Sequence, residues 1–100
     1  MSRTICLNSD IGELPGETGR AMDRAILDVV SRCSIACGGH AGDDDSMRAT
    51  LKAAKARHVV VGAHPSYPDR QNFGRKSMKM PQDELESSLR QQVRALGSFA

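Results

Sequence analysis

The chain has 100 residues, with 14 Lys and Arg against 12 Asp and Glu, which gives a formal net charge of +2. This length suits one domain of modest size, so we expect residues 1–100 to form a single domain. The basic residues are scattered singly through polar stretches, which argues against binding to nucleic acid or to a membrane surface. The first apolar run, residues 4–7, is too short for a signal-peptide core or a membrane span.

The cysteines favour a protein with reduced thiols. Cys33 and Cys37 are four residues apart, a spacing that fits neither the redox Cys-x-x-Cys motif nor a pair of zinc knuckles. Each of the three cysteines, Cys6 included, is surrounded by apolar residues, where a free cysteine behaves as a small hydrophobe. We therefore expect a cytoplasmic protein without disulfides.

Short apolar runs alternate with helical patterns along the chain. The first predicted strand covers residues 4–7 and stops at a polar, glycine-bearing segment, residues 8–19. A helix is predicted from Met22, because apolar residues then recur at the spacings of one helical face. Residues 34–37 form the second predicted strand, which a pair of glycines ends. The apolar positions of the first helix are Met22, Ala25, Ile26, Val29 and Val30.

The second half of the chain repeats this alternation. Residues 43–46 supply capping side chains and acidic charge for a second helix. Residues 59–61 form the clearest strand, which is predicted to end at Gly62. After a long loop, residues 65–80, Pro81 is predicted at the first position of a third helix. The apolar stripes of these helices are Met47, Leu51 and Ala54, then Leu85, Leu89, Val93 and Leu96, with Gly97 as the predicted stop.

The order β-α-β-α-β-α predicts an α/β fold with parallel strands joined by crossovers. In such sheets the loops that follow the strands gather at one edge, where function usually lies. Three strands cannot close a barrel, which takes about eight. We therefore expect the first portion of a larger sheet, and a chain that by itself is weakly stable and prone to associate through open strand edges.

The first of these loops presents Asn8, Asp10 and Glu13. Polar side chains directly after a strand are candidates for contacts with a substrate. Asn and Asp also satisfy the hydrogen bonds of turns, and this segment taken alone favours that structural role.

The second loop carries Gly38, His40 and Gly42 and leads into Asp43 at a helix N-terminus. Glycines expose backbone amide donors, and a helix N-terminus favours negative charge, so the loop has the features of an anion site. It lacks the spacing of a P-loop or of a dinucleotide fingerprint. A glycine-rich turn without function is the alternative, although such a turn does not require His40.

The third loop places His64 at the end of the clearest strand and continues to Tyr67, Asp69 and Arg75. We interpret these four residues as candidates for catalysis and for contacts with substrate. A guanidinium such as that of Arg75 can hold a carboxylate or a phosphate at two points. His58, at a predicted helix end, is better suited to capping carbonyl groups or facing solvent.

Asp10, His40 and His64 follow three consecutive strands, so they are the candidate catalytic residues. They could form a metal site, since zinc accepts one carboxylate and two imidazoles and leaves one position open. They could equally be an acid–base cluster that polarises an amide and positions water. The spacing of the residues does not separate these two hypotheses.

Four segments resemble, in order and in separation, the motifs of the LamB/YcsF family, which supplies the A subunit of 5-oxoprolinase. The resemblance extends from about residue 4 to the last residue. Three positions depart from the usual pattern of the family: Gly39 replaces an aromatic residue, Ser34 an asparagine and Lys76 an arginine. The matching segments are residues 7–13, 35–43, 62–69 and 73–75.

This resemblance implies a cytoplasmic enzyme subunit that opens the lactam of 5-oxo-L-proline (pyroglutamate) to L-glutamate, with hydrolysis of ATP to ADP and phosphate. It implies ATP with magnesium as cofactor, subunits B and C as partners, and 5-oxoproline as the small-molecule substrate. It also implies a (β/α) barrel of the glycoside hydrolase/deacetylase type, of which this chain supplies the first three β-α units. Members of the family are longer, so we do not expect the 100-residue chain to act alone.

Two alternatives belong to other functional classes. One is a metal-dependent carbohydrate deacetylase or hydrolase, which the Asp10, His40 and His64 set would suit. The other is a non-catalytic, truncated module that binds anions. ATP-dependent release of glutamate, metal-dependent deacetylation without ATP, or binding without turnover would distinguish the three functions.

Overall fold

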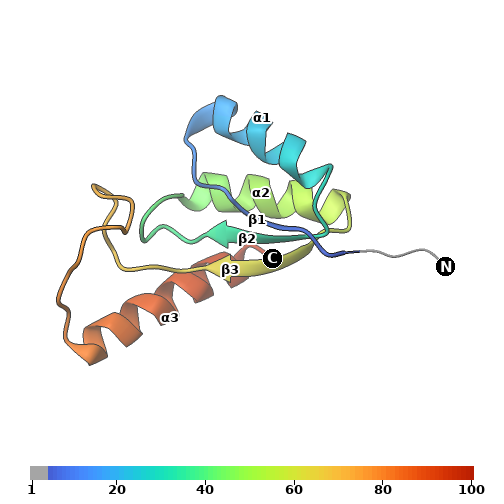
Figure 1. The fold of residues 1–100 in the computed structure, drawn as a ribbon. Helices are drawn as coiled ribbons and strands as arrows, with labels where there is room; N and C mark the ends of the chain where they lie inside the picture. The colour runs from blue at the N-terminus through green and yellow to red at the C-terminus, as the bar shows by residue number, and fades with distance from the viewer. Residues whose placement is uncertain (1–4) are drawn as a thin grey trace.

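The computed structural model describes residues 5–100, in which three strands and three helices alternate along the chain (Figure 1). The strands are β1 (Asn8–Ile11), β2 (Arg32–Ala36) and β3 (Val60–His64), and the helices are α1 (Gly16–Leu27), α2 (Asp44–Ala56) and α3 (Gln82–Ser98). The strands form one sheet in the order β1-β2-β3, and both neighbouring pairs are parallel. The predicted α/β class with a parallel sheet is therefore confirmed.

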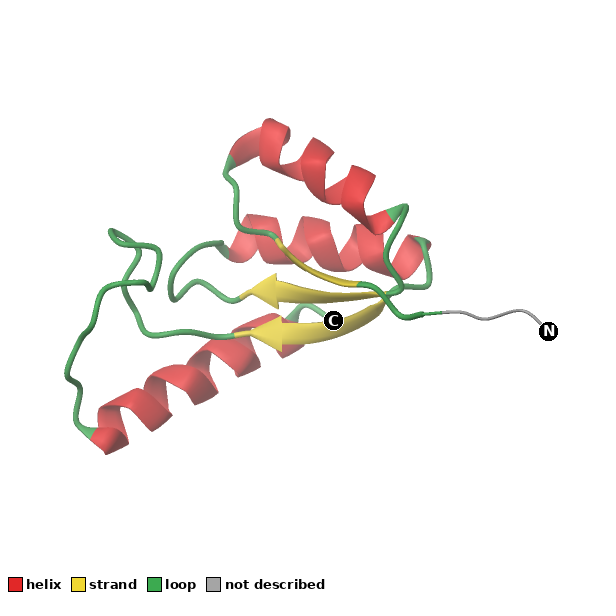
Figure 2. Cartoon of the chain, in the orientation of Figure 1, coloured by secondary structure: helices red, strands yellow, loops and turns green. Residues whose placement is uncertain are grey.

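The two faces of the sheet differ in chemistry. Ile11, Cys33 and Ile35 point to one face and are each at most 1% exposed. Alternation along the strand sends Asn8 and Asp10 to the other face, where both are exposed. The helices contribute to the buried core Leu27 from α1, Met47 and Ala54 from α2, and Leu96 from α3. The helices therefore cover the apolar face, and the loops that follow the strands gather beyond the arrowheads (Figure 2).

Strand β1 lies later in the chain than predicted. The prediction was residues 4–7, of which the first lies outside the described residues, whereas the strand is Asn8–Ile11. Ile5 and Leu7 are 81% and 44% exposed, and Ile11 is the residue that enters the core. The prediction followed the strand propensity of apolar residues, and it was wrong because one face of β1 is polar and open.

Helix α1 begins before Met22, and its buried face overlaps the predicted one only in part, since Ile26 and Val30 pack against the core. Its buried residues are Gly19, Asp23 and Leu27, four positions apart, whereas Met22 and Val29 are 50% and 71% exposed. The predicted face was wrong in part, because the charged residue Asp23 occupies the middle of the buried face. Its carboxylate is tolerated there because it is fully paired.

The carboxylate of Asp23 holds the beginning of the β1–α1 loop. Its Oδ1 accepts a hydrogen bond from the backbone amide of Gly12 at 3.1 Å, and its Oδ2 pairs with the Arg20 guanidinium at 3.0 Å. Thr50 of α2 donates to the same carboxylate at 3.5 Å. Arg20 also donates to the carbonyl of Leu14 at 2.8 Å. One buried ion pair therefore fastens both sides of this loop.

The other two strands overlap their predicted positions. Strand β2 runs over Arg32–Ala36, where residues 34–37 were predicted. Strand β3 was predicted to end at Gly62 but continues, because Gly62 and Ala63 pair in register with β2. His64 is consequently the last residue of β3 and not part of the loop that follows.

Helix α2 begins as predicted, and α3 differs at both ends. The Asp43 carboxylate accepts from the Ser46 amide at 2.8 Å, and the Ser46 hydroxyl accepts from the Asp43 amide at 2.8 Å, which completes a capping box. Pro81 is the N-cap of α3 and not its first helical residue, and α3 passes Gly97. Gly97 does not adopt the left-handed conformation of a C-terminal glycine, so the last turn continues. Val93 of the predicted stripe is 46% exposed.

The outer edges of the sheet are open within the described residues. Strands β1 and β3 each pair on one side only, and Val60 and Val61 of β3 are 55% and 37% exposed. The expected tendency of the chain to associate stays a prediction. Of the helices in residues 5–100, none has the length and apolar character that crossing a membrane requires.

The Asp23 network gives a prediction for stability. Asp23→Ala should lower the free energy of unfolding by about 3 kcal/mol, because the charge of Arg20 would remain buried without an anionic partner and the amide of Gly12 without an acceptor. Asp28→Ala is the matched control: this carboxylate is 64% exposed and pairs with Arg57 at 2.7 Å, so its loss should cost under about 1 kcal/mol. Urea unfolding measures both changes, and equal losses would contradict the role given to Asp23.

The cysteines give a second prediction. Burial raises the pKa of the Cys33 thiol, and the Asp23 carboxylate adds to this effect. Burial also raises the pKa of Cys37, against a smaller lowering by a hydrogen bond from the His64 backbone. Fewer thiolates form at a raised pKa, so only the exposed Cys6 of the three free thiols should react quickly with Ellman's reagent at pH 8. Cys6→Ser should abolish that phase, and rapid labelling of Cys33 or Cys37 in the folded protein would contradict the prediction.

Candidate active site

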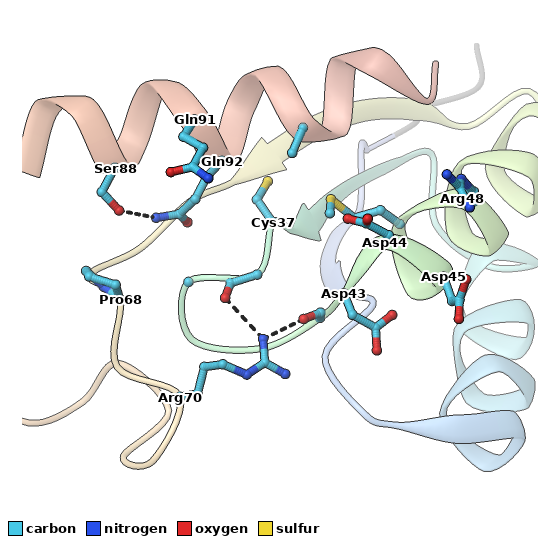
Figure 3. Close-up of a pocket in the computed structure, with 15 residues that line it drawn as sticks. Cys37, Asp43, Asp44, Asp45, Arg48, Pro68, Arg70, Ser88, Gln91 and Gln92 are labelled. Carbon is cyan, nitrogen blue, oxygen red and sulfur yellow. Dashed lines mark hydrogen bonds between the residues drawn. The ribbon is translucent and has the colours of Figure 1, made fainter.

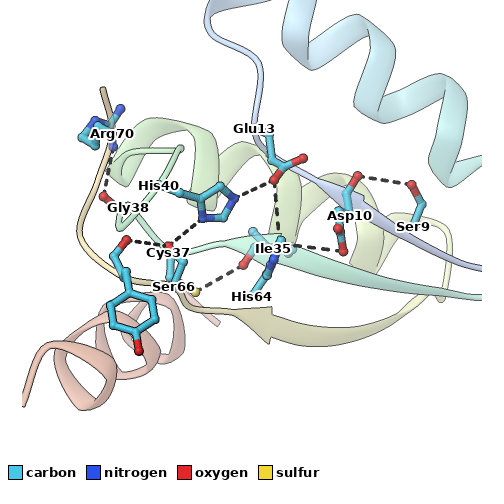
Figure 4. A network of polar contacts seen from close by, with 12 residues as sticks. Ser9, Asp10, Glu13, Ile35, Cys37, Gly38, His40, His64, Ser66 and Arg70 are labelled. Carbon is cyan, nitrogen blue, oxygen red and sulfur yellow. Dashed lines mark hydrogen bonds and ion pairs between the residues drawn. The ribbon is translucent and has the colours of Figure 1, made fainter. Parts of the chain in front are cut away.

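Four titratable side chains converge where the strands end (Figure 4). Nε2 of His40 lies 2.6 Å from Oε2 of Glu13. Nδ1 of His64 lies 3.7 Å from Oδ1 of Asp10 and 3.8 Å from Oε2 of Glu13. The two imidazole rings are tilted by 57°, and their centroids are 4.7 Å apart. One carboxylate therefore faces both histidines.

The parallel register explains this convergence. Asp10 lies in β1, Glu13 in the loop after it, His40 in the loop after β2, and His64 at the end of β3. Because all three strands run in the same direction, their carboxyl ends meet at one edge of the sheet. The structure thus brings together the three predicted catalytic residues and adds Glu13 as the group that links the histidines. The catalytic roles themselves stay predictions.

The imidazole of His40 is enclosed. The residue is 5% exposed, and its Nδ1 lies 2.8 Å from the hydroxyl of Ser66. The edge of the Phe73 ring packs on it at right angles, with centroids 5.0 Å apart. A Cβ on Gly74 would come within 3.0 Å of the His40 Cβ, and Gly74 has a φ of +71°. The β3–α3 loop therefore covers His40, and the close approach requires glycine at position 74.

The other three groups are accessible to different degrees. The side chains of Asp10, His64 and Glu13 are 53%, 32% and 20% exposed, against 4% for His40. The Nδ1 atom of His64 is itself buried and makes no hydrogen bond within residues 5–100. A small molecule that reaches this edge of the sheet would meet Asp10, His64 and Glu13 first, with His40 behind them.

The glycine loop after β2 is held in shape by Arg70, a residue that no motif in the sequence marks. Its guanidinium donates to the carbonyls of Gly38 and Gly42 at 3.1 and 2.6 Å (Figure 3). The amide of Gly38 donates to the Ala41 carbonyl at 2.9 Å, and Asp43 caps α2. Several carbonyl, amide and carboxylate groups of the loop are therefore already hydrogen-bonded within the protein. Anion binding by Gly38, Gly42 and Asp43 stays a prediction.

The remaining predicted contact residues lie around this edge. Asn8 is exposed at the amino end of β1, on the far side of Asp10 from the loops. Tyr67 is 43% exposed, and Asp69 accepts two hydrogen bonds within its own loop. The guanidinium of Arg75 lies 5.5 Å from the centroid of the Phe73 ring, a cation–π contact on the residue that covers His40. Among the described residues, these four make no hydrogen bond to the cluster.

Two open hollows flank the glycine loop. One, of about 650 Å³, has Glu13 and His40 in its wall together with Arg20 and Arg70. The other, of about 760 Å³, lies between the glycine loop and α3. Both have the size of a small-molecule site. The first brings two guanidinium groups near the histidine–carboxylate cluster.

The donor set of the cluster fits a divalent metal in composition. Glu13, His40 and His64 each offer one ligand atom, and these atoms lie within 4.8 Å of one another. One carboxylate and two imidazoles form a common catalytic zinc set. Two ligand atoms of a tetrahedral zinc ion lie roughly 3.3 Å apart. Nε2 of His40 and Oε2 of Glu13 are closer than this, at hydrogen-bond distance. Glu13 would hold such a metal in place of the predicted Asp10.

The arrangement also suits proton transfer without a metal. The carboxylate of Glu13 orients the imidazole of His40 through the contact at Nε2. Asp10 is open to solvent and His64 is partly so, and these side chains can position water or exchange a proton with a bound molecule. The cluster can therefore place an acid and a base on the same small substrate.

Three supporting residues were not predicted from the sequence: Ser66, Arg70 and Gln92. Gln92 of α3 exchanges two hydrogen bonds with the backbone of Ser66. These contacts join residues 26 or more positions apart, and the residue types are common in loops and on helices. No spacing in the sequence marks them.

Together, the parallel sheet and the histidine–carboxylate cluster at its carboxyl edge define an α/β protein with a candidate acid–base site where its strands end. The chain belongs to the LamB/YcsF family, whose model matches residues 5–100. It is 47% identical over its 100 residues to the A subunit of 5-oxoprolinase from Methylococcus capsulatus. It is 49% identical over 96 residues to the A subunit of 5-oxoprolinase from Azoarcus sp. strain BH72.

A solved structure, that of a lactam utilization protein from Thermus thermophilus, matches with a TM-score of 0.87 and 37% identity, over 97% of this chain and 39% of that one. The chain likewise spans 38% of the length of both relatives named above. The family resemblance that the four loop motifs indicated is confirmed.

Proposed function

We propose that this chain contributes the ring-opening site of a 5-oxoprolinase, which converts 5-oxo-L-proline to L-glutamate with hydrolysis of ATP. The observation that carries the proposal is the cluster in which Glu13 lies between His40 and His64, with Asp10 beside His64. Its support is that relatives 47% and 49% identical are named as the A subunit of 5-oxoprolinase. A lactam is a stable amide, so opening it needs both activated water and protonation of the leaving nitrogen.

The differing exposure of the four groups suggests their roles. Asp10 and His64 are the most exposed and would orient the attacking water. His40 is buried behind Glu13, so we assign the proton for the ring nitrogen to the Glu13–His40 pair and not to His40 alone. Arg70 and Arg75 are guanidinium groups near the cluster that could pair with the carboxylate of the substrate or with a phosphate.

The proposal includes the larger assembly. ATP, with magnesium, would activate the amide oxygen by phosphorylation, and subunits B and C would be the partners. The three β-α units would be the first part of a (β/α) barrel of the glycoside hydrolase/deacetylase type. The supporting observation is the cluster at the carboxyl ends of three parallel strands, since the active sites of such barrels draw residues from several strand ends.

The test is glutamate release by the intact protein with ATP and the partner subunits. His64→Ala and His40→Ala should each lower turnover by about a hundredfold or more, because each removes one member of the acid–base cluster. His58→Ala is the matched control: His58 is exposed just after α2 and should leave turnover unchanged. Wild-type turnover in the His64→Ala variant would remove His64 from the mechanism.

A metal-dependent hydrolase or deacetylase is the second candidate, favoured by the common donor set of Glu13, His40 and His64. When bound, a zinc ion would supply an activated water. Elemental analysis of protein purified without chelator separates the two functions. Because Glu13 and His40 are already at hydrogen-bond distance, we expect less than one transition-metal ion per chain. A stoichiometric metal that is lost in His64→Ala would favour the second function.

A further inference from the structure

Gln92 is a buried amide that reaches from α3 to the loop over the cluster. It is 7% exposed, and its side chain exchanges two hydrogen bonds with the backbone of Ser66: the Ser66 amide donates to Oε1 at 3.0 Å, and Nε2 donates to the Ser66 carbonyl at 2.8 Å. Nε2 also donates to the hydroxyl of Ser88 at 3.1 Å (Figure 3). These bonds leave Ser66 little freedom to rotate or shift.

Ser66 transmits this restraint to His40. Its hydroxyl oxygen lies 2.8 Å from Nδ1 of His40 and 3.1 Å from the carbonyl of Tyr67 (Figure 4). A hydroxyl carries one hydrogen and two acceptor sites. It can donate to Nδ1 when that nitrogen carries no proton. When Nδ1 is protonated, the hydroxyl can accept from Nδ1 and turn its hydrogen to Tyr67. Ser66 therefore has a bonded arrangement for either protonation state.

Gly39 supplies the space for this contact. A Cβ at position 39 would lie 2.5 Å from Oε1 of Gln92 and 2.7 Å from the hydroxyl oxygen of Ser66. Both distances are shorter than real Cβ contacts allow, so a larger residue would push the two groups apart. Gly39 does not have a positive φ, so alanine there changes the packing without straining the backbone.

We propose that Gln92 is a positioning residue for His40, acting through Ser66, and that it keeps the imidazole in place during turnover. Because Gly39 has no side chain, Gln92 of α3 can approach Ser66 closely enough to form these hydrogen bonds. The part that concerns turnover rests on the proposed function, whereas the restraint on the imidazole does not. The evidence is a continuous set of contacts from Gln92 to Ser66, His40 and Glu13, each between 2.6 and 3.0 Å.

Turnover of the intact enzyme tests the catalytic part. Gln92→Ala and Gly39→Ala should each lower kcat by roughly tenfold to a hundredfold with little change in KM, because a misplaced imidazole slows the chemical step. The double variant should lose little more than either single one, since both act on the same contact. Gln91→Ala and Gly97→Ala are the matched controls, because Gln91 is exposed and a Cβ at Gly97 meets nothing within 4 Å. Additive losses would overturn the shared route through Ser66.

The ring nitrogens of His40 provide a measurement that needs no activity. In ¹⁵N NMR spectra of the intact protein, Gln92→Ala should move the Nδ1 signal of His40 in the same direction as Ser66→Ala, and Gln91→Ala should leave it in place. Gln92→Glu keeps the size of the side chain and the acceptor for the Ser66 amide but loses the donor to the Ser66 carbonyl, so it is a second variant that should move the signal. An unchanged Nδ1 signal in a folded Gln92 variant would overturn the proposal, even where no glutamate is released.

Discussion

The contact between Glu13 and His40 holds the site together, because it joins the loop after β1 to the loop after β2. At 2.6 Å it is the shortest link among the four titratable groups. Its partners come from different strands, so it depends on the parallel register that brings both loops to one edge. Once it is formed, Glu13 faces His64 as well. The carboxylate thus connects a buried imidazole to a second imidazole that solvent can reach.

Each end of that contact is supported by a buried polar group on a helix. On one side, the Asp23 carboxylate of α1 binds the Gly12 amide, directly before Glu13. On the other side, the Gln92 amide of α3 binds the backbone of Ser66, which in turn contacts His40. Buried polar groups are costly unless they are fully bonded. Asp23 and Gln92 are both bonded in this way, and both lie within one or two contacts of the cluster.

The shape of the sheet and the chemistry of the site are linked through the face that the helices leave open. All three helices pack their apolar residues on one face, so the other face can carry Asp10 and the accessible edge of His64. The chain matches relatives that are more than twice as long. In a larger sheet of this kind, further strand ends would line the same region and complete the walls of the site.

The sequence by itself determined the α/β class, the cap of α2, the family, and the three residues Asp10, His40 and His64 that meet at one edge, because these depend on local chemistry and on the order of elements. It misplaced β1 and part of the buried face of α1, since apolar residues were equated with buried ones. Only the tertiary structure decided that Glu13 joins the two histidines and that Arg70 and Gln92 hold the loops. Those contacts connect residues 26 or more positions apart, and their partners are chosen by the packing of helices on the sheet, which no spacing along the chain records.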